Sequence, residues 1–263
     1  MFSSFMTNAW IVGTVVSLLA GATGFFVVMR GSSFAAHAIP NGAFAGAAGA
    51  ALVGVTPLAG LITFAVVSSV GIGASRRHRG DVATALALVM MLALGAAFLS
   101  LSGAYEPQVE ALLFGQILGV ATTSIVPVVV IASLCALALA VMYRPLLFNA
   151  AAPDLAAVKG LNPQLLEMGF MLTLALGAAL TVPVVGALLT FSLTVGPPAA
   201  ARLVTRRPGS ALVASMALSA ITLWVSIAAS YQSNLPVGFF VGTSSALVYV
   251  LARILTRWRG RRA

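Results

Sequence analysis

Apolar runs of membrane-spanning length follow one another along almost the whole chain, and nearly every charged residue lies in the short gaps between them. A transmembrane helix needs about 20 mainly apolar residues, with a tolerated range of roughly 17 to 25. The pattern therefore predicts an all-α, polytopic membrane protein. The predicted spans are residues 10–29, 37–54, 58–74, 82–101, 124–143, 165–181, 184–195, 210–231 and 235–255.

The segment 184–195 is the shortest of these and lies between Pro183 and the run Gly196-Pro197-Pro198. Because proline breaks or kinks a helix, this segment fits either a complete span or a broken helix. The sequence thus predicts eight or nine spans. We also expect the double proline to end the span and a short Ala-rich helix to follow it before Pro208.

Lysine and arginine residues occur in alternate gaps, whereas the other gaps contain none. These positions are Arg30, the cluster of residues 76–79, Arg144 with Lys159, Arg202 with Arg206 and Arg207, and the tail from Arg253 to Arg262. Because cations are retained on the cytoplasmic side, nine spans with the N-terminus outside and the C-terminus inside satisfy every gap. Eight spans would need one segment that is re-entrant or lies at the membrane interface.

The composition supports the same class of protein. Hydrophobic residues make up 60% and charged residues 7% of the chain, whereas soluble domains carry about 25% charged residues. A length of 263 residues predicts one integral membrane domain over residues 1–263 with no room for an ATPase, so any ATP hydrolysis must come from a partner. We expect the first apolar segment to be a retained span rather than a cleaved signal.

The net charge of +9 does not indicate nucleic-acid binding, because the arginines lie beside apolar segments instead of forming a basic face with interleaved aromatic residues. They are typical of topology signals that face anionic lipid. Cys135 is the single cysteine, which excludes an intramolecular disulfide and a cysteine metal cluster. In the second span, Gly42, Gly46 and Gly49 form a small-residue face at which helices can pack closely.

Few polar residues lie at membrane depth, and such residues are functional candidates. His37 lies seven residues, or about 10 Å of helix rise, beyond Arg30, and Pro40 and Asn41 follow it. Its imidazole could be a metal ligand, a proton carrier or a helix-to-helix hydrogen-bonding group, and the residues alone favour the last of these. Glu167 lies near the start of the sixth span, where we expect a capping or interface residue.

Six short sequence motifs occur in order along nearly the whole chain. They are Gly24-Phe25-Phe26-Val27-Val28-Met29-Arg30, Asp81 after the cation cluster, Leu113-Phe114-Gly115-Gln116-Ile117-Leu118, Arg144-Pro145-Leu146-Leu147 with Pro153-Asp154-Leu155-Ala156, Gly186-Ala187-Leu188-Leu189 before residues 197–203, and Ser230-Tyr231 with Leu235-Pro236-Val237-Gly238. In these motifs the chain resembles the permease subunit of the ATP-binding-cassette importers for manganese, zinc and iron.

The resemblance implies a permease that is not itself an enzyme, lies in the cytoplasmic membrane, and pairs with a second copy or with a sibling permease. It implies a cytosolic ATP-binding subunit and an extracytoplasmic metal-binding protein as partners. The implied cargo is a divalent cation of zinc, manganese or iron, with no tightly bound cofactor. The implied contacts with the ATPase are Ala199, Ala200, Arg202, Leu203 and Arg206.

The resemblance also implies a metal site on the second span. The family pattern is Asp-Ala-x-x-His-Ala-x-Leu-Pro-Gly, in which the Asp and the His project from one helical face toward the passing cation. Here His37 is the implied metal ligand, Ser33 stands in the position of the Asp, and Asn41 follows as polar lining of the path. Because a hard divalent cation prefers carboxylate oxygen, this site is less charged, and its His suits zinc or iron better than manganese.

Two other classes of protein stay open at this point. An ATP-independent secondary carrier usually uses intramembrane acids or broken helices to couple ion movements, and Glu167 is the one acid within the predicted spans. A non-transporting membrane scaffold would also account for the Gly and Ala faces.

Overall fold

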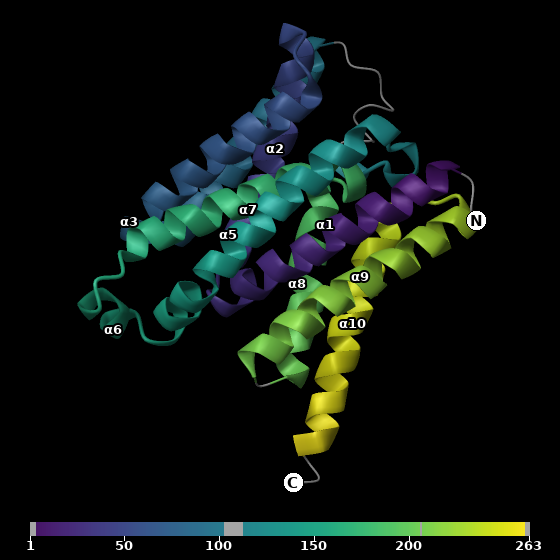
Figure 1. Ribbon diagram of the computed structural model, residues 1–263. Coiled ribbons are helices and arrows are strands. Elements are labelled where there is room, and N and C mark those ends of the chain that lie inside the picture. Colours follow the sequence, from purple (N-terminus) through teal and green to yellow (C-terminus); the bar gives the residue numbers. More distant parts are fainter. Residues whose placement is uncertain (1–3, 103–112, 206, 261–263) are drawn as a thin grey trace.

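The computed structural model of the chain describes residues 4–102, 113–205 and 207–260, and helices dominate these ranges (Figure 1). No strand occurs among the described residues. The helices are α1 (Ser4–Met29), α2 (Ser33–Val53), α3 (Pro57–Ser102), α5 (Ile125–Ala151), α6 (Pro153–Val158), α7 (Pro163–Val185), α8 (Ala187–Val204), α9 (Pro208–Ser233) and α10 (Val237–Gly260), with short 3-10 turns η1 (Ile117–Gly119) and η2 (Thr122–Ser124). The predicted all-α fold is confirmed.

Seven helical segments in the described ranges are long and apolar enough to cross a membrane. They are Met6–Met29, Pro57–Ala74, Thr84–Ser102, Thr122–Ala151, Pro163–Val185, Pro208–Ser233 and Val237–Trp258. Each of them corresponds to a predicted span. Helices α2 and α8, with 21 and 18 residues, correspond to the two remaining segments, and the choice between eight and nine crossings stays a prediction.

Helix α3 contains two predicted spans, and its 46 residues fold back on themselves. The Phe64 and Phe98 rings lie 6.3 Å apart, although a straight helix would separate the two residues by about 50 Å. The chain therefore reverses direction between two limbs, Pro57–Ala74 and Thr84–Ser102. Both limbs pack on α2, where Gly49 faces the Phe98 ring.

The small residues of α2 let its backbone approach α3 closely. A Cβ atom on Gly46 would overlap the carbonyl oxygen of Gly60, and a Cβ atom on Gly42 would overlap the Ser68 hydroxyl. Any larger side chain at these two glycines would push the helices apart. The predicted small-residue face is a helix-packing surface, as expected for close contact between membrane helices.

Helix α1 lies in the middle of the bundle and contacts α5, α7, α8 and α9. A Cβ atom on Gly24 would overlap the carbonyl oxygen of Thr194 on α8. On the α9 side, the Ser215 hydroxyl donates a hydrogen bond to the Gly21 carbonyl at 2.6 Å. Two glycines of α1 thus bring its backbone into direct contact with two other helices.

The expected stop at the double proline is wrong. Helix α8 continues through Pro197 and Pro198 to Val204, and the chain bends instead at Gly186, which has a φ of 94°. An interior proline is tolerated where the surrounding packing offsets the lost hydrogen bond. Here the Pro198 ring fills space that Gly24 leaves open on α1, since an added Cβ there would lie 2.7 Å from the ring.

The motif at residues 113–118 lies against this bend. The Gln116 N–H donates a hydrogen bond of 3.2 Å to the carbonyl of Pro183, which lies inside α7. Gly115 has a φ of 80°, and a Cβ atom there would overlap the Val184 carbonyl oxygen. Glycine is therefore required at this position for both backbone conformation and space.

Candidate functional site

Ser33, His37 and Asn41 lie at successive turns of α2, so their side chains share one face of the helix. The helix begins at Ser33 because the chain turns back just after α1, where the Ser32 N–H donates a hydrogen bond of 2.9 Å to the Val27 carbonyl. The structure thus brings the three predicted path residues together on one helix. We refer to them below as the α2 stripe.

His37 is half-buried between α2 and α8. Its ring meets the Phe191 ring of α8 edge to face, with 5.1 Å between the ring centroids. The Nδ1 atom is buried and has no hydrogen-bond partner among the described residues. Within the described chain, the contact of His37 with its neighbouring helix is therefore aromatic, and the hydrogen bond favoured by the sequence is not formed at this nitrogen.

Asn41 is fully buried one turn further along α2. Its Nδ2 atom donates a hydrogen bond of 2.7 Å to the His37 carbonyl. The Oδ1 atom has no partner in the part of the chain that the structure describes. Buried polar atoms are almost always paired, so this amide oxygen and the His37 Nδ1, which have no partner in the described chain, are exceptions.

The α2 stripe offers a cation one imidazole, one amide oxygen and one hydroxyl, and none of these groups carries a charge when the imidazole is neutral. Across the described ranges, no three His, Cys, Asp or Glu side chains come together as a metal cluster. Imidazole nitrogen suits transition metals, and amide oxygen suits harder cations. A single copy of the stripe can therefore supply part of a coordination sphere.

The predicted partner surface is the last turn of α8. Arg202 and Leu203 are exposed there, whereas Ala200 is fully buried against the bundle and Ala199 is half-buried. Arg206 lies outside the described residues. The helix dipole favours a cation such as Arg202 near the C-terminus of a helix. This turn therefore presents the positive charge of Arg202 beside the apolar side chain of Leu203.

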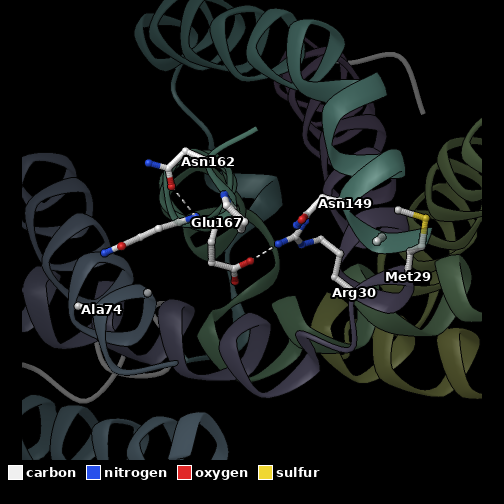
Figure 2. A pocket seen from close by; sticks show the side chains of 10 residues that line it. Met29, Arg30, Ala74, Asn149, Asn162 and Glu167 are labelled. Carbon is white, nitrogen blue, oxygen red and sulfur yellow. Dashed lines mark hydrogen bonds and ion pairs between the residues drawn. The ribbon is translucent and has the colours of Figure 1, made fainter. Parts of the chain in front are cut away.

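A cavity of about 680 Å³ lies at the ends of α1, α5 and α7 and beside the first limb of α3 (Figure 2). Arg30 and Glu167 form an ion pair in its wall, with side chains only 8% and 15% exposed. The Arg30 guanidinium also lies over the Phe170 ring, 5.5 Å from the ring centroid. Sequence reasoning missed this pair because it treated Arg30 as a topology signal, although both charges stand at span ends predicted to share one side.

Glu167 is an interface residue, and its predicted alternative role as a helix cap is wrong. The cap of α7 is Asn162, whose Oδ1 accepts hydrogen bonds from the Gln164 and Leu165 N–H groups at 3.0 and 3.2 Å. Asn162 and Glu167 both line the cavity and are seen together in Figure 2. The cavity wall thus combines a capped helix start with a buried ion pair.

The cavity also supports the predicted sidedness of the helix ends. Its lining comes from the end of α1, the end of the first limb of α3, the end of α5 and the start of α7. The charge pattern predicts all four of these ends on the cytoplasmic side. All four ends line one cavity, and this agrees with the predicted alternation of spans across the membrane.

A second cavity, of about 450 Å³, lies at the opposite ends of α5 and α7. Its lining includes Pro57 at the start of α3, Gln116 and Ser124 of the segment before α5, and Pro183 of α7. Neither this cavity nor the first one is lined by residues of the α2 stripe. In the single chain, the two cavities and the stripe are therefore separate features.

Comparison with known proteins places these features in context. Residues 2–256 match the ABC 3 transport family. The manganese transport system membrane protein MntC of Listeria monocytogenes is 25% identical over 260 residues, which cover 98% of this chain and 92% of that protein. A probable iron transport system membrane protein of Haemophilus influenzae is also 25% identical, over 98% of this chain and 96% of that protein.

The fold is shared with a solved structure, PsaBC from Streptococcus pneumoniae in complex with Fab. The TM-score is 0.87 with 23% sequence identity, and the match covers 95% of this chain and 91% of that chain. The similarity includes α2 and α8 because it extends over almost the whole length.

Proposed function

We propose that this chain, which belongs to the ABC 3 transport family, is the membrane permease subunit of an ATP-driven importer of divalent transition metal cations. The observation that carries the proposal is the match to manganese and iron transport membrane proteins over 98% of the chain. The permease itself hydrolyses no ATP in this proposal. A separate cytosolic subunit supplies that step, and an extracytoplasmic binding protein delivers the cation.

The cargo is a divalent cation of manganese, iron or zinc. The names of the relatives support manganese and iron, whereas the His37 imidazole suits iron or zinc better than manganese. Ser33 in place of a carboxylate lowers the negative charge of the path, which weakens binding of hard cations most.

The path for the cation passes the α2 stripe. Support for this role comes from the buried Nδ1 of His37 and Oδ1 of Asn41, which have no partner among the described residues. A second permease, either an identical copy or a sibling, would add a second set of ligands to the incomplete set of one chain. Two imidazoles and two amide oxygens would then be available to one cation.

The ATPase docks on the last turn of α8. Arg202, Leu203 and Val204 are exposed on this turn, and a reversal of charge at Arg202 should uncouple ATP hydrolysis from uptake. Normal coupled uptake by the Arg202→Glu variant would show that this docking surface is wrongly assigned. Lys159→Glu, another exposed cation in a gap predicted to be cytoplasmic, is the matched control.

The function is tested by deleting the gene and measuring growth in medium depleted of manganese, iron or zinc, followed by rescue with each metal. We expect a growth defect that one of these metals relieves and that the intact gene complements. Growth indistinguishable from the parent in all three media would contradict the proposal. Uptake that persists without any ATPase subunit would instead identify an ATP-independent carrier.

A further inference from the structure

The Arg30–Glu167 ion pair joins the end of α1 to the start of α7 in surroundings that largely exclude solvent. Aromatic contacts connect the same region: the Phe26 ring of α1 lies 6.2 Å from the Phe170 ring of α7 and 6.0 Å from the Tyr143 ring of α5. The three helices α1, α5 and α7 therefore meet at one junction. We call Arg30, Glu167, Phe26, Phe170 and Tyr143 the α1–α5–α7 junction.

A buried ion pair adds little net stability, because the cost of removing both charges from water offsets their attraction. Such pairs are best explained where they select one arrangement of structural elements over another. The junction fits this explanation, since its charges come from two different helices and its rings from three.

The region of the junction also contains hydrogen-bond donors and an acceptor that are not paired with each other. The Nε and Nη1 atoms of Arg30 are buried and have no partner among the described residues, and the same is true of the Asn149 Oδ1 atom on α5. Both side chains line the same cavity, and Figure 2 shows Asn149 lying toward the Arg30 guanidinium. The Arg30 donors and the Asn149 acceptor are therefore complementary groups that face one cavity without pairing.

We propose that Arg30 is a positioning residue of the transport cycle with two arrangements. In the arrangement described here it holds α7 through Glu167, and in a second, closed arrangement it also holds α5 through the Asn149 amide oxygen. The three helix ends then move as a unit, and the cavity on the predicted cytoplasmic side opens and closes. This inference rests on the proposed function, because it assigns the two arrangements to an ATP-driven cycle.

The test uses the permease assembled with its co-expressed ATPase in lipid vesicles. Spin labels on Ala151→Cys and Leu165→Cys, at exposed positions on α5 and α7, report the distance between the two helix ends with and without a non-hydrolysable ATP analogue. Native Cys135 is buried and is therefore not the labelling site. Manganese, iron and zinc uptake per ATP hydrolysed are measured on the unlabelled complex.

The variant Asn149→Leu keeps the shape of the side chain and removes the oxygen that Arg30 would bind. We expect it to assemble normally, to lose the nucleotide-dependent change in distance, and to transport about fivefold less cation per ATP, a size typical of mutations that change coupling between sites. Glu167→Gln should do the same, and the charge exchange Arg30→Glu with Glu167→Arg should recover part of the coupling. Asp154→Asn, which removes an exposed acid on α6, is the control and should behave as the original chain.

A purely structural junction predicts a different result. Asn149→Leu and Glu167→Gln would then change the melting temperature of the complex but leave the distance change and the uptake per ATP as in the original chain, and that result would overturn the inference. If Glu167→Gln fails to assemble, Asn149→Leu decides alone. Failure of the proposed function is recognised separately, because the original complex would then transport none of the three metals while the distance measurement still reports on the junction.

Discussion

The α2 stripe and the α1–α5–α7 junction are two regions of the described chain with buried polar groups, the first on the predicted path and the second at the predicted cytoplasmic end. The stripe is neutral and carries two buried atoms without partners in the described chain, His37 Nδ1 and Asn41 Oδ1. The junction is charged, and its Arg30 and Glu167 neutralise each other. Both regions contain buried atoms without partners in the described chain, Arg30 Nε and Nη1 at the junction included, so the difference between them is that the junction holds a charged pair within the protein and the stripe holds no charge.

The largest expected effect is on stability, and it distinguishes the junction from the α2 stripe. Glu167→Ala leaves the Arg30 charge buried and unpaired, which should cost about 3 kcal/mol of unfolding free energy. Thermal unfolding in detergent measures this loss. The double variant Arg30→Met with Glu167→Leu removes both charges and should recover most of the stability, and a double variant as unstable as Glu167→Ala would contradict a mutual pairing of the charges.

His37→Ala should have the opposite profile, with little effect on assembly and a large effect on transport. Removal of the one imidazole of the stripe should reduce cation uptake by more than about tenfold, since even outer-shell changes at metal sites cost 10–100-fold. Uptake into vesicles containing the assembled complex is the measurement, with Phe191→Leu as a control for the lost ring contact. Unchanged uptake would remove His37 from the path.

A smaller effect is expected when the missing carboxylate is supplied. Ser33→Asp places an acid one turn before His37 on the same face of α2, and we expect about a fivefold shift of preference toward manganese, since about 1 kcal/mol corresponds to a factor of this size. Competition between manganese and zinc for uptake checks the shift. An unchanged preference would show that the two side chains do not act on the same cation.

The smallest effect on stability is expected at Asn41. Asn41→Leu replaces a buried amide that has an unpaired oxygen by an apolar group of similar shape, so the unfolding free energy should change by less than about 1 kcal/mol. Uptake should nevertheless fall, because the oxygen is lost from the path. A strong loss of stability without a loss of uptake would mark Asn41 as a structural residue that supports the helix around Pro40.

Much of the fold could be predicted from the sequence because membrane helices can be recognised from their composition and length. The cation cluster at residues 76–79 correctly predicts two separate spans, although the structure assigns a single helix, α3, to both limbs. The course of α8 was not predictable in this way. Whether Pro197 and Pro198 end a helix depends on the space beside them, and that space is created by Gly24, which lies far away in the sequence.

In the candidate site, too, the sequence predicts the arrangement of residues within one helix but not the contacts between distant helices. The spacing of Ser33, His37 and Asn41 placed them on one helical face because neighbours along one helix follow from the sequence alone. The pairing of Arg30 with Glu167 joins positions 137 residues apart, and local sequence carries no signal for such a distance. The useful signal was the sidedness of the charges, which narrows the choice of partners for a buried cation.

The glycine at position 24 has a mechanical consequence. It brings the α1 backbone against the α8 backbone and against the Pro198 ring, and Arg30 follows six residues later, directly after the last residue of α1. With no side chain between the two backbones, no rotamer change can absorb a displacement of α8. A displacement of the exposed end of α8 is therefore expected to move α1 as a rigid helix. This movement would shift the Arg30 guanidinium, which lies at the end of α1.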